Sequence, residues 1–201
     1  MRLRVIELGS CKPIPDSRVD IWHADAGGVY SGYANQGDAR NISAKGETYL
    51  RGTQMTAADG FATFQTIYPG WYPGRTPHVH VKVFLDAKTL VTGQIYFPDA
   101  VSARIYREHP AYVVRPVADT TNATDFLFKS GGKESGGTVL TIDEGKSPLL
   151  ASLVIAVDRS GDGGGLVGRH RAQQFLGAGQ VVALAMVAQP GAHHGQRGVN
   201  L

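Results

Sequence analysis

Two histidines spaced two positions apart, His78 and His80, begin an alternating apolar stretch directly after a loop rich in proline and glycine. On a β-strand, side chains two positions apart point to the same face about 7 Å from one another, so both imidazoles could reach one cation. For this pair alone, two solvent-facing histidines opposite an apolar stripe of Val79, Val81 and Val83 are an equally good interpretation. The pair therefore defines a candidate metal site that needs further ligands.

The loop ahead of this strand adds a phenol. Tyr72 stands between two Pro-Gly pairs, in a backbone stiff enough to aim its side chain. A free tyrosine titrates near pH ~10, but a trivalent cation would hold its phenolate at neutral pH. Ferric iron suits anionic oxygen together with imidazole, whereas zinc or copper would more often recruit a carboxylate or a cysteine. Further tyrosines lie in this loop and in the earlier part of the chain. Taken singly, each of the following four is better explained as a packed aromatic residue than as a metal ligand: Tyr30, Tyr33, Tyr68 and Tyr72.

Residues 1–158 contain short runs typical of β-strands, separated by turn residues, and these elements must position the histidines and tyrosines. This pattern favours a sandwich or barrel over alternating β and α units. Only 100–107 is typical of a helix, with Asp99 as its N-cap and Pro110 closing the segment. We predict an all-β domain over 1–158, a two-sheet β-sandwich with long loops and one short helix. The predicted strands are 2–8, 18–23, 61–67, 78–85, 90–97, 138–142 and 149–157.

Two kinds of segment lie outside the predicted strands. Loops rich in glycine, asparagine and serine fill 31–48 and 119–137, and loops of that length in a compact domain usually cover or build a site. Residues 159–201 are rich in glycine and show no strand alternation, so we predict a disordered tail there.

Composition narrows the function classes. The chain has 201 residues, 42% hydrophobic and 18% charged, which predicts one globular domain. Its one cysteine, Cys11, excludes an internal disulfide and a Cys-rich zinc site. The formal net charge of +3 falls entirely within 159–201, and no basic stripe with aromatic residues crosses the neutral remainder. We therefore expect neither nucleic acid nor a membrane as partner.

Three motifs together resemble the intradiol ring-cleavage dioxygenases, a family that includes catechol, hydroxyquinol and protocatechuate dioxygenases. They are VDIWHADAGGVYSGY at 19–33, LRGTQMTAADGFATFQTIYPGWYPGRTPHVHV at 50–81 and TGQIYFPDA at 92–100. The resemblance covers roughly residues 2–158. It implies a segment ahead of the first strand that helps to wall the substrate pocket, so this chain is expected to be truncated at its N-terminus.

The resemblance also implies a site and a reaction. One non-haem Fe(III) per chain would be bound by Tyr30, Tyr72, His78 and His80. The iron would activate a catechol-type substrate so that O2 cleaves the ring between its two hydroxylated carbons, giving a cis,cis-muconate type product. Tyr72 would be displaced by the substrate and act as a base. Arg75 would stabilise the negative charge that develops on the substrate. Gln94 would orient a metal ligand without binding the metal itself.

Two other classes stay open at this stage. One is a non-catalytic β-sandwich binding module, an inactive truncated paralogue, since a fold alone implies no activity. The other is a zinc hydrolase that uses His78 and His80 with a carboxylate such as Asp86 or Asp99. For the dioxygenase, the expected partners are a catechol-type small molecule and O2, and a homo-oligomer is compatible with this function. No secretory signal is visible, so a cytoplasmic location is expected by default.

Overall fold

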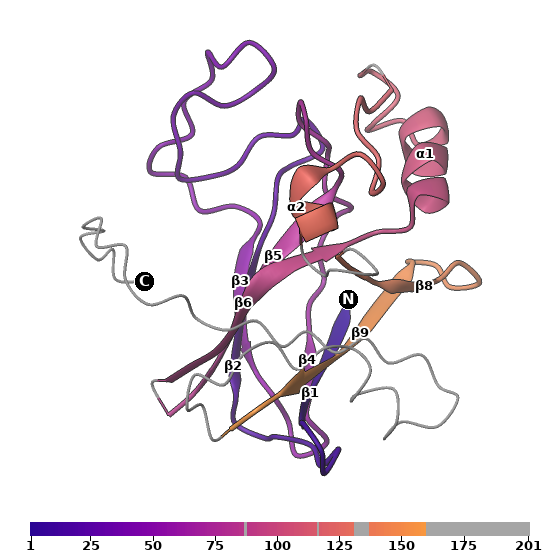
Figure 1. Cartoon of the computed structure of the whole chain (residues 1–201). Helices are drawn as coiled ribbons and strands as arrows, with labels where there is room; N and C mark the ends of the chain where they lie inside the picture. The colour runs from indigo at the N-terminus through magenta and orange to yellow at the C-terminus, as the bar shows by residue number, and fades with distance from the viewer. Residues whose placement is uncertain (87, 116, 131–136, 160–201) are drawn as a thin grey trace.

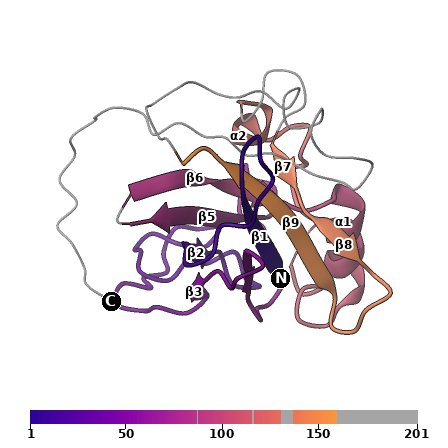
Figure 2. The same cartoon turned by 90° about the horizontal axis from the view of Figure 1, so that it is seen from below.

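The computed structural model of the chain describes residues 1–86, 88–115, 117–130 and 137–159. Within these residues two sheets pack into a sandwich, with strand orders β4-β1-β9-β8 and β3-β2-β5-β6-β7. Strands β1 and β9 of the first sheet cross over β5 and β6 of the second (Figures 1 and 2). The predicted all-β sandwich is confirmed.

The observed elements follow most of the predicted strand runs, but the predicted strand 61–67 was too long. Only Phe61–Thr63 forms β4, because it pairs with Arg2–Arg4 of β1 alone. The predicted 138–142 strand is divided into two short strands. Strand β3, at the edge of the second sheet, was not predicted because its residues do not alternate between apolar and polar side chains. The elements are β1 Arg2–Glu7, β2 Arg18–Trp22, β3 Arg51–Met55, β4 Phe61–Thr63, β5 His78–Leu85, β6 Lys88–Tyr96, α1 Asp99–Glu108, α2 Phe126–Ser130, β7 Thr138–Val139, β8 Thr141–Asp143 and β9 Leu150–Val157.

The core lies between the two sheets and is built by the alternation of β5. Val79, Val81 and Val83 are at most 1% exposed and point into the core, where they meet side chains of the first sheet such as Val5 and Ile155. Because neighbouring residues on a strand point to opposite faces, the same alternation turns His78 and His80 away from this core.

The helix differs in two ways from the prediction. Helix α1 has Pro98 as its N-cap, and Asp99 lies inside its first turn, where its carboxylate accepts a hydrogen bond from the backbone amide of Asn122. The predicted N-cap was therefore wrong. A second helix of five residues, α2, was not predicted; Asp125 caps it by accepting hydrogen bonds from the amides of Leu127 and Phe128 at 2.8 and 2.9 Å.

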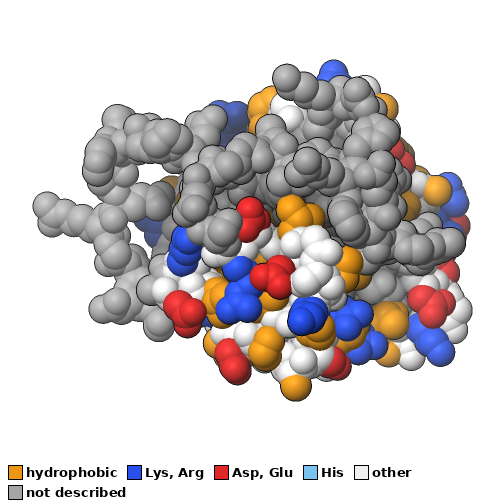
Figure 3. Space-filling model, turned by 60° about the horizontal axis from the view of Figure 1, so that its bottom comes forward, with side chains coloured by type: hydrophobic (Ala, Val, Ile, Leu, Met, Phe, Trp, Pro, Cys, Tyr) orange, Lys and Arg blue, Asp and Glu red, His pale blue; other side chains and the backbone are white. Residues whose placement is uncertain are grey.

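Both helices lie at one end of the sandwich, together with the long loop that follows β2 (Figure 1). The predicted tail, 159–201, lies outside the described residues except for Arg159. On the described part of the face seen in Figure 3, basic and acidic side chains are interspersed among apolar ones. Within the described residues no helix is long and apolar enough to span a membrane.

The core predicts a face-dependent cost of truncation on β9. Ile155 is fully buried, so Ile155→Ala should lower the free energy of unfolding by about 2–5 kcal/mol. Val154 is the adjacent residue on the opposite, partly exposed face, and Val154→Ala should cost clearly less. Urea unfolding of both variants measures the difference, and equal losses would contradict this account of the core.

Candidate functional site

Strand register sets one face of the site. In the second sheet β5 pairs with β2 and with β6, so that Trp22, His80 and Gln94 form one row across the three strands. His78 pairs with Tyr96 in the next row. The ring of His80 stacks flat on that of Trp22, with centroids 4.7 Å apart and an interplanar angle of 5°. The sheet thus fixes both imidazoles on the face that points away from the core.

The two tyrosines come from loops whose backbones touch. A Cβ atom on Gly70 would lie 2.4 Å from the carbonyl oxygens of Asp25 and Ala26, and one on Gly28 would lie 2.1 Å from the carbonyl of Trp71. Gly28 also has φ +80°, a conformation that favours glycine. These contacts bring the loop of Tyr30 against that of Tyr72, with ring centroids 5.7 Å apart.

The four predicted ligand side chains converge on one point. The hydroxyls of Tyr30 and Tyr72 lie 3.1 and 3.3 Å from Nε2 of His78. The ring of His80 lies 5.1 Å from that of His78 and 5.7 Å from that of Tyr30, measured between centroids. Nδ1 of His78 donates to the carbonyl of Thr76 at 2.8 Å, so the lone pair of Nε2 faces the phenols.

This donor set fits a hard cation. Two hydroxyls compete for the single lone pair of His78 Nε2, whereas a cation between them would be bound by phenolate oxygen and imidazole nitrogen together. Two phenolates and two imidazoles are the ligands that ferric iron accepts. Among the described residues, no Asp, Glu or Cys joins His78 and His80 in a group of three. No carboxylate of the described residues, Asp86 and Asp99 included, therefore completes the ligand set that the zinc hydrolase requires.

Burial controls the protonation of the donors. Burial, and next the charge of Arg75, lowers the pKa of His78 to about 3 and that of His80 to about 4. Burial also raises the pKa of Tyr30 well above its usual value, with the neighbouring Tyr72 adding to the effect. Burial raises the pKa of Tyr72 as well, against the opposing charge of Arg75. Without a cation, all four donors are therefore neutral at pH 7.

Arg75 is held by a buried network beside the donors. Its Nε donates to Asp125 at 2.8 Å, its Nη2 to Gln94 at 2.5 Å and its Nη1 to the hydroxyl of Tyr72 at 3.1 Å. Burial disfavours the charged carboxylate of Asp125, but the amides of Phe128 and Thr76, together with Arg75, hold its pKa below the usual value. The arginine is thereby fixed with one N–H directed at a metal-ligand candidate.

Sequence reasoning missed two members of this network. Tyr96 donates to the same oxygen of Gln94 at 2.8 Å, and Asp125 is fully buried. An aspartate directly before an apolar run is a helix N-cap signal, and it could have located α2. Asp125 and Arg75 are 50 positions apart in the sequence, so no local pattern predicts their pairing.

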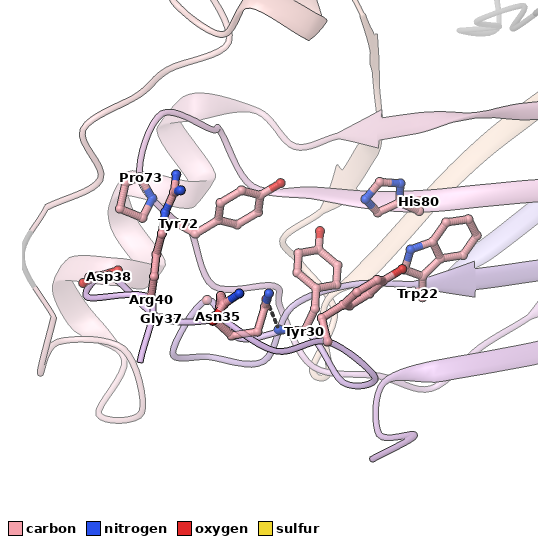
Figure 4. Close-up of a pocket in the computed structure, with 12 residues that line it drawn as sticks. Trp22, Tyr30, Asn35, Gly37, Asp38, Arg40, Tyr72, Pro73 and His80 are labelled. Carbon is pink, nitrogen blue, oxygen red and sulfur yellow. Dashed lines mark hydrogen bonds between the residues drawn. The ribbon is translucent and has the colours of Figure 1, made fainter. Parts of the chain in front are cut away.

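A pocket of about 450 Å³ opens onto the donors from the side of the 31–48 loop. Figure 4 shows Tyr30, Tyr72 and His80 with their polar atoms turned into it, and Trp22 behind His80. Arg75 and Gln94 are not among its lining residues; Arg75 donates to the hydroxyl of Tyr72, and Gln94 accepts from Arg75. The lining residues are Trp22, Gly28, Tyr30, Tyr33, Asn35, Gln36, Gly37, Asp38, Arg40, Tyr72, Pro73 and His80.

The structure thus brings together all six predicted site residues. His78, His80, Tyr30 and Tyr72 form the donor cluster, and Arg75 and Gln94 adjoin it. Their roles as ligands and as catalytic groups stay predictions.

Comparisons with known proteins agree with one another. A dioxygenase family model matches residues 4–104. The protocatechuate 3,4-dioxygenase beta chain of Burkholderia cepacia is 38% identical over 107 residues, which are 47% of this chain and 42% of that protein. The match thus spans less than half the length of this curated relative.

Solved structures extend the likeness over more of the chain. An intradiol ring-cleavage dioxygenase from Tetranychus urticae is 31% identical, with 78% of each chain covered and a TM-score of 0.68. The dioxygenase domain of a carbohydrate-binding fusion protein from Streptomyces sp. SirexAA-E is 29% identical, with 78% of this chain and 77% of that chain covered and a TM-score of 0.51.

The neutral state of the donors predicts proton release on metal binding. Since both phenols must ionise while both histidines are already neutral, binding of a trivalent cation at pH 7 should release about two protons from the protein. Affinity should consequently rise with pH through the neutral range. Calorimetry in buffers of different ionisation enthalpy, with one ferric chelate throughout, measures the number.

Tyr30→Phe is the matched control for this release. It removes one phenol and should reduce the release to about one proton. Release that stays the same in Tyr30→Phe would show that Tyr30 is not a ligand.

Proposed function

The chain belongs to the intradiol ring-cleavage dioxygenase family, and on that basis we propose that it binds one ferric ion and uses O2 to cleave catechol-type rings between the two hydroxylated carbons. The product would be a dicarboxylic acid of the cis,cis-muconate type. The observation that supports this most directly is the convergence of two phenols and two imidazoles at the end of an open pocket.

Tyr30, Tyr72, His78 and His80 would hold the metal. A bound ferric ion would keep both phenols ionised and would draw electron density from a chelated catecholate, which makes the ring reactive toward O2. The remaining chemistry is supplied by the side chains around it, and their positions assign distinct roles to the two tyrosines.

Tyr72 is the better candidate for a base. Tyr30 is only 9% exposed and packs against Tyr33, Tyr72 and both histidines. Tyr72 is less buried, borders the pocket next to Pro73 and has its hydroxyl oxygen within reach of Arg75. Because Tyr72 is less enclosed than Tyr30, we expect its phenolate to take a hydroxyl proton from the catechol while Tyr30 keeps its place.

Arg75 contributes a fixed positive charge next to this proton transfer. Because Asp125 and Gln94 hold its other nitrogens, the Nη1 donor needs no reorganisation as charge builds up near Tyr72. Asp125 offsets part of the charge, which lets the guanidinium remain buried.

Aromatic and polar side chains complete the pocket lining. Trp22 backs His80, Tyr33 stands at the edge of Tyr30, and Asn35 and Arg40 supply polar groups farther from the donors. We expect a catechol ring to bind in this pocket with its hydroxyl groups toward the donors.

The activity test is stoichiometric oxygen uptake with a panel of catechols. We expect about one ferric ion per chain, a visible tyrosinate-to-iron absorption band, and one O2 consumed per ring-cleaved product. Iron-loaded protein that shows the band but consumes no O2 with any catechol would favour the non-catalytic binding module. Stoichiometric zinc without a visible band would contradict the metal assignment.

Substitution of Arg75 separates its role from that of the ligands. Arg75→Leu should keep the absorption band and lower kcat by about 10²–10³, because one preorganised donor is lost, with a much smaller change in KM. Arg75→Lys should recover only part of kcat, since it lacks the planar fork. Steady-state kinetics and absorption spectra of both variants give the comparison.

Arg75→Leu also leaves Asp125 buried without its partner, so the folding of this variant is checked by thermal melting. Arg75→Lys retains a cation for Asp125 and remains informative if the leucine variant unfolds. Wild-type kcat in either variant would exclude Arg75 from catalysis.

A further inference from the structure

Arg115 lies outside the donor cluster but contacts both loops that supply its tyrosines. Its Nη1 donates to the backbone carbonyl of Trp71 at 2.5 Å, and its Nη2 donates to Asp38 at 2.6 Å. The centre of its guanidinium lies 4.1 Å from the centroid of the Trp71 ring. One side chain therefore binds the residue before Tyr72 and a residue of the 31–48 loop at the same time.

A third contact reaches the turn that precedes Tyr30. A Cβ atom on Gly28 would lie 2.9 Å from Nη1 of Arg115 and 2.1 Å from the carbonyl of Trp71. Gly28, Trp71 and Arg115 thus meet at one point, with no room for a side chain on the glycine. Since Gly28 is two residues from Tyr30, the guanidinium sits where the two loops come closest.

The surroundings of Arg115 differ from those of an ordinary surface ion pair. Its side chain is 13% exposed, whereas Arg104 and Glu144, which pair on the surface, are 41% and 49% exposed. Exposed ion pairs of the latter kind contribute little to stability. Asp38 is itself half exposed, so the carbonyl contact and the stacking on Trp71 carry most of the constraint on Arg115.

Arg115 also joins the two sides of the pocket. Asp38 and Gly37 belong to its wall on the 31–48 loop, and Tyr72 and Pro73 belong to the opposite wall. Figure 4 shows Asp38 and Gly37 at the end of the pocket where Pro73 lies, far from Trp22 and His80. A link from Asp38 through Arg115 to Trp71 therefore sets how far these walls stand apart.

We propose that Arg115 is a positioning residue: it fixes the separation of the Tyr30 and Tyr72 loops, and through it the metal affinity of the donor cluster and the width of the substrate pocket. The inference rests on the proposed function only for the identity of the metal and substrate. Loss of this link leaves each tyrosine intact but lets the two phenol oxygens move relative to one another.

The test compares Arg115→Gln, Arg115→Lys and Asp38→Asn with wild type, and uses Arg104→Gln as the matched control at an exposed ion pair. Amide hydrogen exchange of the metal-free proteins is measured first. Arg115→Gln should accelerate exchange in 28–42 and in 68–74 together, while β1 and β9 exchange as in wild type. This measurement is independent of iron and of activity.

Ferric affinity is the second measurement, followed through the tyrosinate absorption. Arg115→Gln should weaken ferric binding by about 10–100-fold, as substitutions of residues that hold metal ligands in place do. Arg115→Lys should weaken it less, because it keeps the cation but lacks the fork that serves two acceptors. Asp38→Asn should have the smallest effect, and Arg104→Gln should have none.

Faster exchange confined to the residues around 115, or unchanged ferric affinity in Arg115→Gln, would overturn the proposal. If Arg115→Gln does not fold, Arg115→Lys decides the exchange test, because it keeps the cation but lacks the fork that serves two acceptors. Exchange in both loops equal to wild type would then count against the proposal. A wild-type protein without oxygenase activity would contradict the proposed function but not this inference, because the exchange test uses metal-free protein.

Discussion

The candidate site depends on one steric constraint, the contact of two loop backbones at Gly28 and Gly70. A side chain at either position would collide with a carbonyl oxygen of the other loop. Without this contact, Tyr30 and Tyr72 would approach the sheet separately and could not both reach Nε2 of His78. The chemistry that the site offers is therefore a consequence of residues that carry no chemistry of their own.

The sheet and the loops have different tasks in this arrangement. Strands β2, β5 and β6 supply a rigid base, because their register places Trp22, His80 and Gln94 side by side and buries the valines of β5 on the opposite face. The loops supply the phenols and the arginine, and buried polar contacts hold them. The carboxylate of Asp125 links helix α2 to Arg75, since one of its oxygens caps α2 and the other accepts a hydrogen bond from Arg75.

Local patterns in the sequence predicted what depends on neighbours along the chain. The alternation from His78 to Val83 fixed which face each side chain takes, and the Pro-Gly pairs around Tyr72 correctly indicated a constrained loop. Strand β3 escaped prediction because Arg51–Met55 is an edge strand without an apolar face. Asp125 and Arg115 also escaped it, since their partners are distant in sequence and a single charged residue in a loop has no periodicity. Tyr30 was identified through family resemblance, as its own surroundings suggest only a packed aromatic.

The neutrality of the four donors bears on how the protein matures. Burial holds both histidines deprotonated and both tyrosines protonated at pH 7, so the empty cluster has no net charge and no internal repulsion. No cation is therefore needed to neutralise like charges at this cluster while the chain folds. If the cluster binds a metal as proposed, the ion can enter a site that is already folded, so protein synthesis and metal supply need not coincide.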